Sequence, residues 1–188
     1  LAAIFMNISI DRLLKNYSNA RRSWEAWCFM ANFNLKPPQP KVCEYIDKDD
    51  LLFHLRYLAF KDFHIEMYKI LKDSKKNQNK DNIFYLLEKL SSENKRKHSA
   101  AQKRLIQLTR SKTTIDRICE TRDKFYAHLD KEYENYQGKV LNLLWVLDCF
   151  VAVEKAIITL TSRKILQSHL DNIPSKDDYK LSFGLTVY

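Results

Sequence analysis

The chain has 188 residues, a formal charge of +9, two glycines and four prolines. This length fits one packed domain and is short for two. Two glycines can hardly supply the glycine-rich phosphate loops of nucleotide-binding folds. The positive charge favours an anionic partner such as nucleic acid, although charge carries no information on fold. Apolar residues recur at helical spacing and rarely alternate, so the sequence predicts an all-α protein.

The first predicted helix runs from about residue 9 to residue 33. Its apolar side is formed by Ile10, Leu13, Leu14, Tyr17, Trp24, Cys28 and Phe29. Three prolines in the segment 37–40 remove amide donors and favour extended backbone, so they end this helix. We therefore expect residues 1–40 to form an N-terminal extension helix with a proline-rich connection, packed on a helical bundle of residues 41–170. Residues 171–188 are expected to form a C-terminal tail.

The bundle is expected to begin with a helix over about residues 50–73, capped by Asp47 or Asp49. The residues predicted to face inward are Leu51, Leu52, Leu55, Leu58, Ala59, Phe63, Met67, Ile70 and Leu71. A polar connection over 73–81 and a helix over about 82–91 follow.

The last long helix is predicted over about residues 139–169, and it is apolar on nearly all sides between Leu141 and Leu160. A helix that is apolar all round must be covered on all sides. It is therefore either the centre of the bundle or shared with a second subunit, and we expect some dimer contact.

Four cysteines stand at positions 28, 43, 119 and 149, without a Cys-x-x-Cys pair. Cys119 and Cys149 lie among apolar residues, where a free thiol behaves as a small core side chain. We therefore expect a reducing, cytoplasmic compartment. Charged residues interrupt the apolar run 140–160, so no membrane span is expected, and residues 1–5 lack the basic start of a signal peptide. No histidine or cysteine spacing suits zinc or a di-metal bundle, so neither a metal nor a cofactor is expected.

The stretch from Lys89 to Lys112 carries eight lysines or arginines against one acid, Glu93. We place it on the approach to an RNA site. The candidate RNA-binding residues are Lys95, Arg96, Lys97, Lys103 and Arg104, together with Lys124. A merely solvated helix face is the alternative interpretation of this charge.

The most distinctive stretch is Thr121 to Asp130, late in a helix predicted to start near Ser111 or Thr114 and to end close to His128. Arg122 falls on the apolar face of that helix, which Ile118 and Cys119 help to form. A guanidinium there requires a carboxylate, a phosphate or carbonyl groups within reach. The sequence leaves two interpretations of Arg122 open: it is either a structural arginine or an arginine that binds an anion.

Arg122, Asp123 and His128, with five residues between arginine and histidine, resemble the signature of the HEPN superfamily. The segment Arg-Asp-Lys-Phe-Tyr-Ala-His-Leu-Asp is most similar to the AbiU2-like branch, which is associated with abortive infection and toxin-antitoxin systems. We extend the resemblance over roughly residues 45–170. It implies an up-and-down helical bundle, here with an additional N-terminal helix.

The resemblance implies a metal-independent endoribonuclease or RNA-targeting toxin in phage defence, a homodimer with a composite site, and an antitoxin protein as a possible partner. The catalytic candidates are Arg122, Asp123 and His128. His128 suits proton transfer, Arg122 suits the charge that develops on phosphate, and Asp123 could orient either one.

Helix geometry sets a condition on this site. Six steps of about 100° put His128 roughly 240° from Arg122 on an unbroken helix. Either the helix ends or kinks near Ala127, or a partner subunit supplies the complement. The alternatives are a catalytically silent HEPN module that binds RNA, nucleotide or a protein, and a purely structural bundle in which Arg122 is buried.

Overall fold

A computed structural model describes residues 2–34, 38–72, 81–123, 142–175 and 178–179, with side chains from residue 6 onward. Within these ranges the chain forms α-helices and no strand, which confirms the all-α prediction. The helices of the described residues are α1 (Ala2–Met30), α2 (Pro40–Lys48), α3 (Asp50–Leu71), α4 (Ile83–Glu93), α5 (His98–Arg110), α6 (Lys112–Thr121), α7 (Leu143–Leu160) and α8 (Arg163–Leu170).

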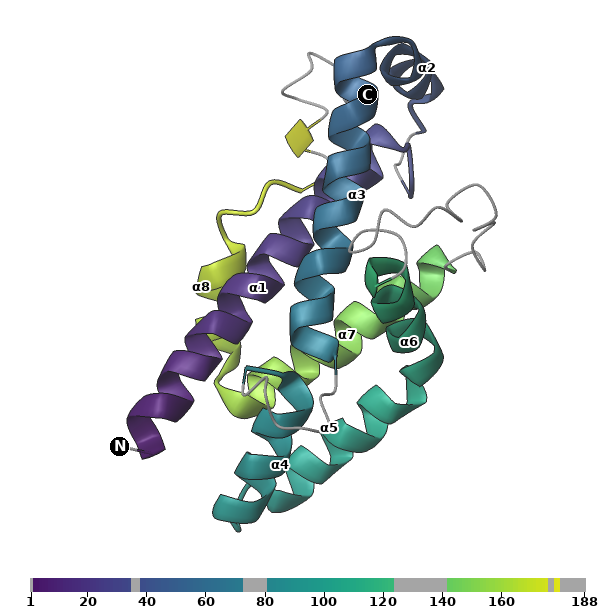
Figure 1. The fold of residues 1–188 in the computed structure, drawn as a ribbon. Coiled ribbons are helices and arrows are strands. Elements are labelled where there is room, and N and C mark those ends of the chain that lie inside the picture. Colours follow the sequence, from purple (N-terminus) through teal and green to yellow (C-terminus); the bar gives the residue numbers. More distant parts are fainter. Residues whose placement is uncertain (1, 35–37, 73–80, 124–141, 176–177, 180–188) are drawn as a thin grey trace.

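The two longest helices, α1 and α3, lie side by side and form the most extensive helix pair (Figure 1). Helix α8 packs against both α1 and α7, and α6 packs against α3. Helices α4 and α5 form a hairpin at the end of the molecule opposite α2, and α5 lies along α7. This arrangement brings the ends of α3 and α6 together, where the candidate site lies.

An aromatic cluster joins α1, α3 and α7 at the centre of the core. The ring centroids of Trp24 and Phe63 are 4.9 Å apart, and each lies 5.8 Å from that of Phe150. All three side chains are almost fully buried, and such ring pairs add stability beyond the area that they bury. Helix α1 therefore supplies a central part of the core, while the division of the chain at residue 40 stays a prediction.

The first helix ends at Met30, before the prolines, as its composition predicts. Asn32 and Asn34 follow with φ angles of 53° and 54°, a left-handed conformation that asparagine tolerates better than most residues. The side chain of Asn32 accepts a 2.8 Å hydrogen bond from the amide of Gln39. Pro40 then begins α2, which the sequence analysis did not predict, at the first helical position where its missing amide costs nothing.

Asp49 caps α3 as predicted, because its carboxylate accepts a 2.9 Å hydrogen bond from the amide of Leu52. The inward face predicted for this helix is correct only for its second half, where Phe63 and Met67 are buried. In the first half, Leu51 is 66% exposed and Leu55 is 43% exposed. Their predicted burial is wrong because no described helix except the short α2 covers this end of α3 (Figure 1).

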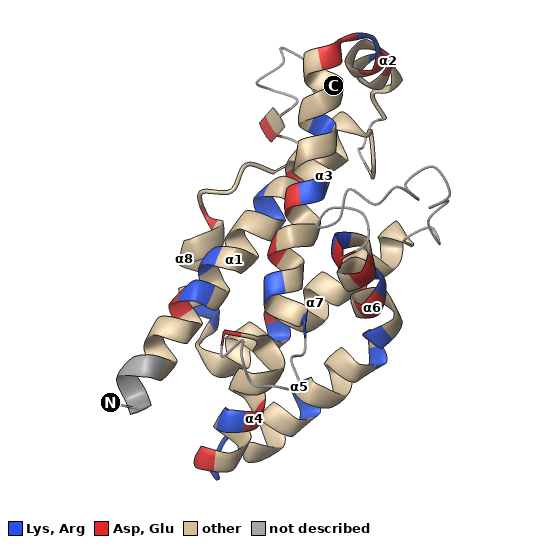
Figure 2. Cartoon of the chain, viewed as in Figure 1, with Lys and Arg blue, Asp and Glu red and all other residues tan. Residues whose placement is uncertain are grey.

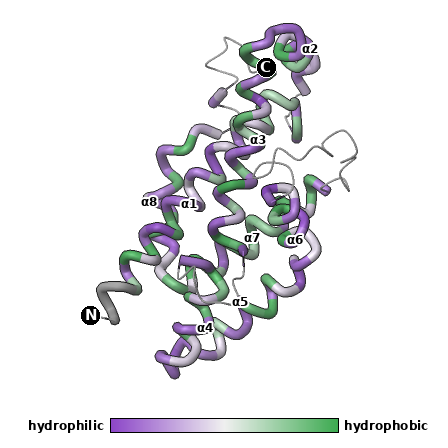
Figure 3. Tube along the Cα trace, in the orientation of Figure 1, coloured by the Kyte–Doolittle hydropathy of each residue, from purple (hydrophilic) through white to green (hydrophobic). Residues whose placement is uncertain are grey.

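The single long helix predicted at the end of the chain is wrong, because α7 ends at Leu160 and α8 begins at Arg163. Ser162 has extended backbone, and its hydroxyl accepts a 3.3 Å hydrogen bond from the amide of Ile165 as the cap of α8. Most of α7 is hydrophobic (Figure 3). The described residues do not give α7 the predicted cover on all sides, since Leu144, Trp145 and Val151 are exposed.

Candidate functional site

The motif helix begins after Ser111, as predicted, and α6 proper ends at Thr121. Arg122 and Asp123 continue it in a wider π-helical turn, a local deviation that is frequent at functional sites. The predicted helix end near His128, the kink near Ala127 and the candidate Lys124 lie outside the described residues. The structure therefore places two of the three motif residues, Arg122 and Asp123.

Arg122 is held from two sides at the end of α6. Its Nη1 atom donates a 3.0 Å hydrogen bond to Oδ1 of Asp123. Its guanidinium carbon lies 4.3 Å from the centroid of the Tyr68 ring on α3, within cation–π range. The side chain is 34% exposed. By helical spacing Arg122 follows the face formed by Ile115, Ile118 and Cys119, and its side chain is only partly buried there.

Asp123 connects the two cations of the site. Its Oδ2 atom accepts a 3.1 Å hydrogen bond from Nζ of Lys72, and its Oδ1 atom accepts the bond from Arg122. Partial burial by itself would raise the pKa of Asp123, but the hydrogen bonds from Lys72 and Arg122 outweigh it and lower the pKa. Asp123 is therefore an anion that orients Arg122.

Tyr68 near the end of α3 and Lys72, which follows it, both have pKa values shifted further above neutral pH. The hydrogen bond to Asp123 is the main cause that raises the pKa of Lys72. Burial, followed by the charge of Asp123, raises the pKa of Tyr68. The cluster of Tyr68, Lys72, Arg122 and Asp123 thus carries two cations and one anion at neutral pH. Arg122 keeps further donors for an oxyanion such as phosphate.

Sequence reasoning missed Tyr68 and Lys72. Their spacing of four places them on one helix face, which is the only signal in the sequence, and it does not reveal that this face meets α6.

The predicted RNA-binding residues fall into two groups. Lys95, Arg96 and Lys103 are exposed. Lys97 donates from Nζ to the carbonyl oxygen of Thr159 at 3.2 Å. Arg104 donates from Nε to the hydroxyl of the same threonine, also at 3.2 Å. The last two therefore tie α5 to α7.

The structure does not bring this basic stretch to Arg122. Lys95 and Arg96 lie in the turn between α4 and α5, and α6 follows the opposite end of α5 (Figure 2). At 1.5 Å per residue, α5 alone spans about 20 Å. An RNA that contacts both regions must therefore extend along α5 and α6.

Cys28, Cys119 and Cys149 are buried, and Cys43 is partly exposed. Burial is the largest cause that raises the pKa of both Cys119 and Cys149, each to about 12. These two thiols are therefore protonated core side chains, as their sequence context predicts.

In the described ranges, no group of three or more histidine, cysteine or acidic side chains is placed to hold a metal ion. None of the helices described is both long enough and apolar enough to cross a membrane.

Comparison of the chain with models of protein families, with curated proteins and with solved structures finds no match.

Proposed function

We propose that this protein is a metal-independent endoribonuclease or RNA-targeting toxin of the HEPN type. The resemblance of Arg122, Asp123 and His128 to the HEPN signature supports the proposal. The observation that carries it is the partly exposed guanidinium of Arg122, which Asp123 and Tyr68 hold in place. A cation that is fixed before the substrate arrives stabilises developing charge without reorganisation at the moment of reaction.

In the proposed reaction, the ribose 2′ oxygen forms a bond to the adjacent phosphorus, and its proton passes to His128. The bond from phosphorus to the 5′ oxygen then breaks, and that oxygen takes up a proton from water. The products are a cyclic phosphate and a free 5′ hydroxyl. Arg122 neutralises charge on the non-bridging oxygens. Because hydrogen bonds lower the pKa of Asp123, this carboxylate is a poor proton acceptor near pH 7, and proton transfer is assigned to His128.

The proposed assembly is a homodimer in which two such motifs face each other. Leu144, Trp145 and Val151 of α7 support this, because large apolar side chains that are exposed on a single chain often mark a protein contact. The proposed setting is the cytoplasm, in phage defence or a toxin-antitoxin system, where an antitoxin protein would be a further partner. The exposed Lys95, Arg96 and Lys103 are proposed to contact RNA backbone.

The test is incubation of purified protein with total RNA and transfer RNA in the presence of a chelator. The parent should cut, and the variants Arg122→Ala and His128→Ala should not. The matched control is Arg117→Ala, since Arg117 lies on the same helix, is 31% exposed and also contacts an acid, Glu120. Cleavage that persists in His128→Ala would contradict the proposed proton transfer.

A catalytically silent module that binds RNA, nucleotide or a protein is the second candidate. The acid–base properties of the described side chains that contact Arg122 favour this candidate. The pKa of Asp123 is lowered and that of Tyr68 is raised, so neither exchanges a proton readily near pH 7. Such a module would still bind RNA without cutting it and would tolerate His128→Ala.

A further inference from the structure

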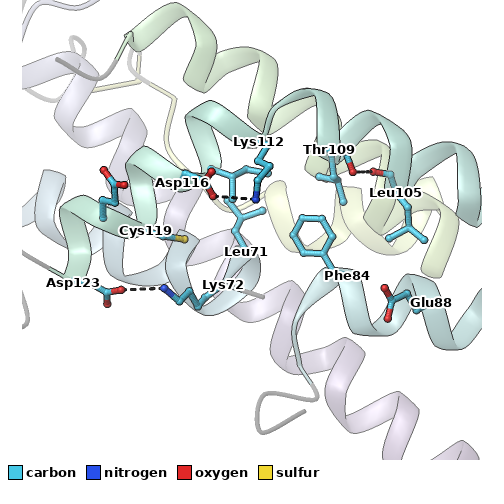
Figure 4. Close-up of a pocket in the computed structure, with 13 residues that line it drawn as sticks. Leu71, Lys72, Phe84, Glu88, Leu105, Thr109, Lys112, Asp116, Cys119 and Asp123 are labelled. Carbon is cyan, nitrogen blue, oxygen red and sulfur yellow. Dashed lines mark hydrogen bonds and ion pairs between the residues drawn. The ribbon is translucent and has the colours of Figure 1, made fainter. Parts of the chain in front are cut away.

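A cavity of about 650 Å³ lies where α3, α4, α5 and α6 meet (Figure 4). Its volume falls within the range of about 300–1,000 Å³ that is typical of small-molecule sites. The apolar part of its lining consists of Leu71, Phe84, Leu105, Leu108 and Ile115. This lining favours a ligand with an apolar body of modest size.

The charged side chains of the cavity are mostly acidic. Glu88, Asp116, Glu120 and Asp123 line it together with two lysines, Lys72 and Lys112. The cavity thus carries four carboxylates against two amines, in a protein whose formal charge is +9. This local excess of negative charge disfavours phosphates and other anions and favours a cation.

Both lysines of the cavity are already paired, as the dashed lines in Figure 4 show. Nζ of Lys72 lies 3.1 Å from Oδ2 of Asp123, and Nζ of Lys112 lies 3.6 Å from Oδ1 of Asp116. Glu120 contacts Arg117 at 3.3 Å. Among the described residues, Glu88 has no cationic partner, so its carboxylate is the one that a bound cation would neutralise.

Glu88 and Phe84 stand one turn apart on α4. Residues four apart are neighbours on one helix face, and both side chains line the cavity (Figure 4). An ammonium group near them would meet a carboxylate and the face or edge of an aromatic ring. The face of such a ring attracts cations.

We propose that this cavity binds a small amphipathic amine. The protonated amino group lies near Glu88, and the aliphatic or aromatic body packs against Phe84, Leu105 and Leu108. The site differs from the Arg122 cluster in the charge of its ligand, although Lys72 and Asp123 border both. The proposal does not depend on ribonuclease activity.

The experiment uses two fluorescent probes of the same size and opposite charge, dansylcadaverine and dansyl-6-aminohexanoate. The amine should bind the full chain saturably, with one probe per chain, and at least about fivefold more tightly than the acid. Replacement Glu88→Gln should weaken the amine about threefold, as expected for an ion pair near the surface, and should leave the acid unchanged or bound more tightly. Phe84→Ala should weaken both probes.

The matched control is Glu93→Gln, which removes an exposed acid from the same helix outside the cavity and should leave binding of the amine unchanged. Equal affinity for the two probes would overturn the proposal. So would an unchanged affinity of Glu88→Gln for the amine, or equal losses in Glu88→Gln and Glu93→Gln. Circular dichroism of each variant verifies that the helices are intact.

Discussion

Lys72, the residue that follows α3, donates a 3.1 Å hydrogen bond from Nζ to Oδ2 of Asp123, which lies 51 positions later and just beyond α6. The other carboxylate oxygen of Asp123 accepts from Arg122. One carboxylate thus connects the ends of two helices and fixes the arginine on which the proposed chemistry depends.

The pair of Lys72 and Asp123 is expected to contribute little to stability. The two side chains are 43% and 35% exposed, so solvent screens the pair and its coupling free energy should stay below about 1 kcal/mol. A double-mutant cycle with Lys72→Met and Asp123→Asn, followed by urea unfolding, measures this coupling. A value of several kcal/mol would show that the pair holds the fold together.

The pH dependence of that coupling follows from the lowered pKa of Asp123. The carboxylate contributes its stabilisation above its ordinary pKa near 3.8 and loses it as the pH falls through the lower value of the folded state. The coupling should therefore be constant from pH 7 to pH 5 and disappear in strong acid. A coupling that vanishes between pH 7 and pH 5 would contradict this assignment.

Arg122→Ala should abolish RNA cleavage and leave the fold intact. Loss of one donor that stabilises transition-state charge costs about 10²–10³ in rate. Because Arg122 is partly exposed and its ion pair lies at the surface, the unfolding free energy should fall by no more than about 1 kcal/mol. Arg117→Ala serves as control for both measurements. A loss of several kcal/mol in Arg122→Ala alone would identify it as a structural arginine.

His64 should make the protein less stable in weak acid. Burial lowers the pKa of His64 to about 4, although the hydrogen bond to the Phe60 carbonyl raises it. Above pH 6.5 the imidazole is neutral in both the folded and the unfolded chain. Between pH 6.5 and about 4 only the unfolded chain binds the proton, so stability should fall by about 1.4 kcal/mol per pH unit and by about 3 kcal/mol in total.

Unfolding free energies of the parent and of His64→Gln, measured from pH 7 to pH 4, test this expectation, because the variant should lose that part of the slope. His54→Gln alters an exposed histidine on the same helix and should keep the slope of the parent. Equal slopes for the parent and His64→Gln would refute the assignment.

Phe63→Ala should destabilise the protein by about 3–5 kcal/mol, because it removes a fully buried ring from the contact between α1, α3 and α7. Phe53→Ala removes the same side chain from an exposed position on the same helix and should cost about 0.5 kcal/mol. Thermal and urea unfolding of the two variants compare them directly. Similar losses in both would show that the exposed end of α3 is covered in solution.

Several elements could be predicted because their signals are local. Helical periodicity, the proline-rich segment and the Asp49 cap each act within a few residues of the backbone that they organise. The break between α7 and α8 was missed because it depends on one serine cap just after the apolar run 140–160. Burial of Leu51 was wrongly predicted because periodicity shows that a helix has an apolar side and does not show whether another helix covers it.

The sequence by itself determined that the chain is helical, where several of its helices begin and end, and that Arg122 and Asp123 are adjacent. Only the tertiary structure decided that Tyr68 and Lys72 meet them, and that the Arg122 side chain is only partly buried. The physical reason is that helix formation depends on hydrogen bonds and caps between near neighbours. The site depends on how α3 and α6 pack against each other. That packing is the combined result of many weak contacts between residues far apart in the chain.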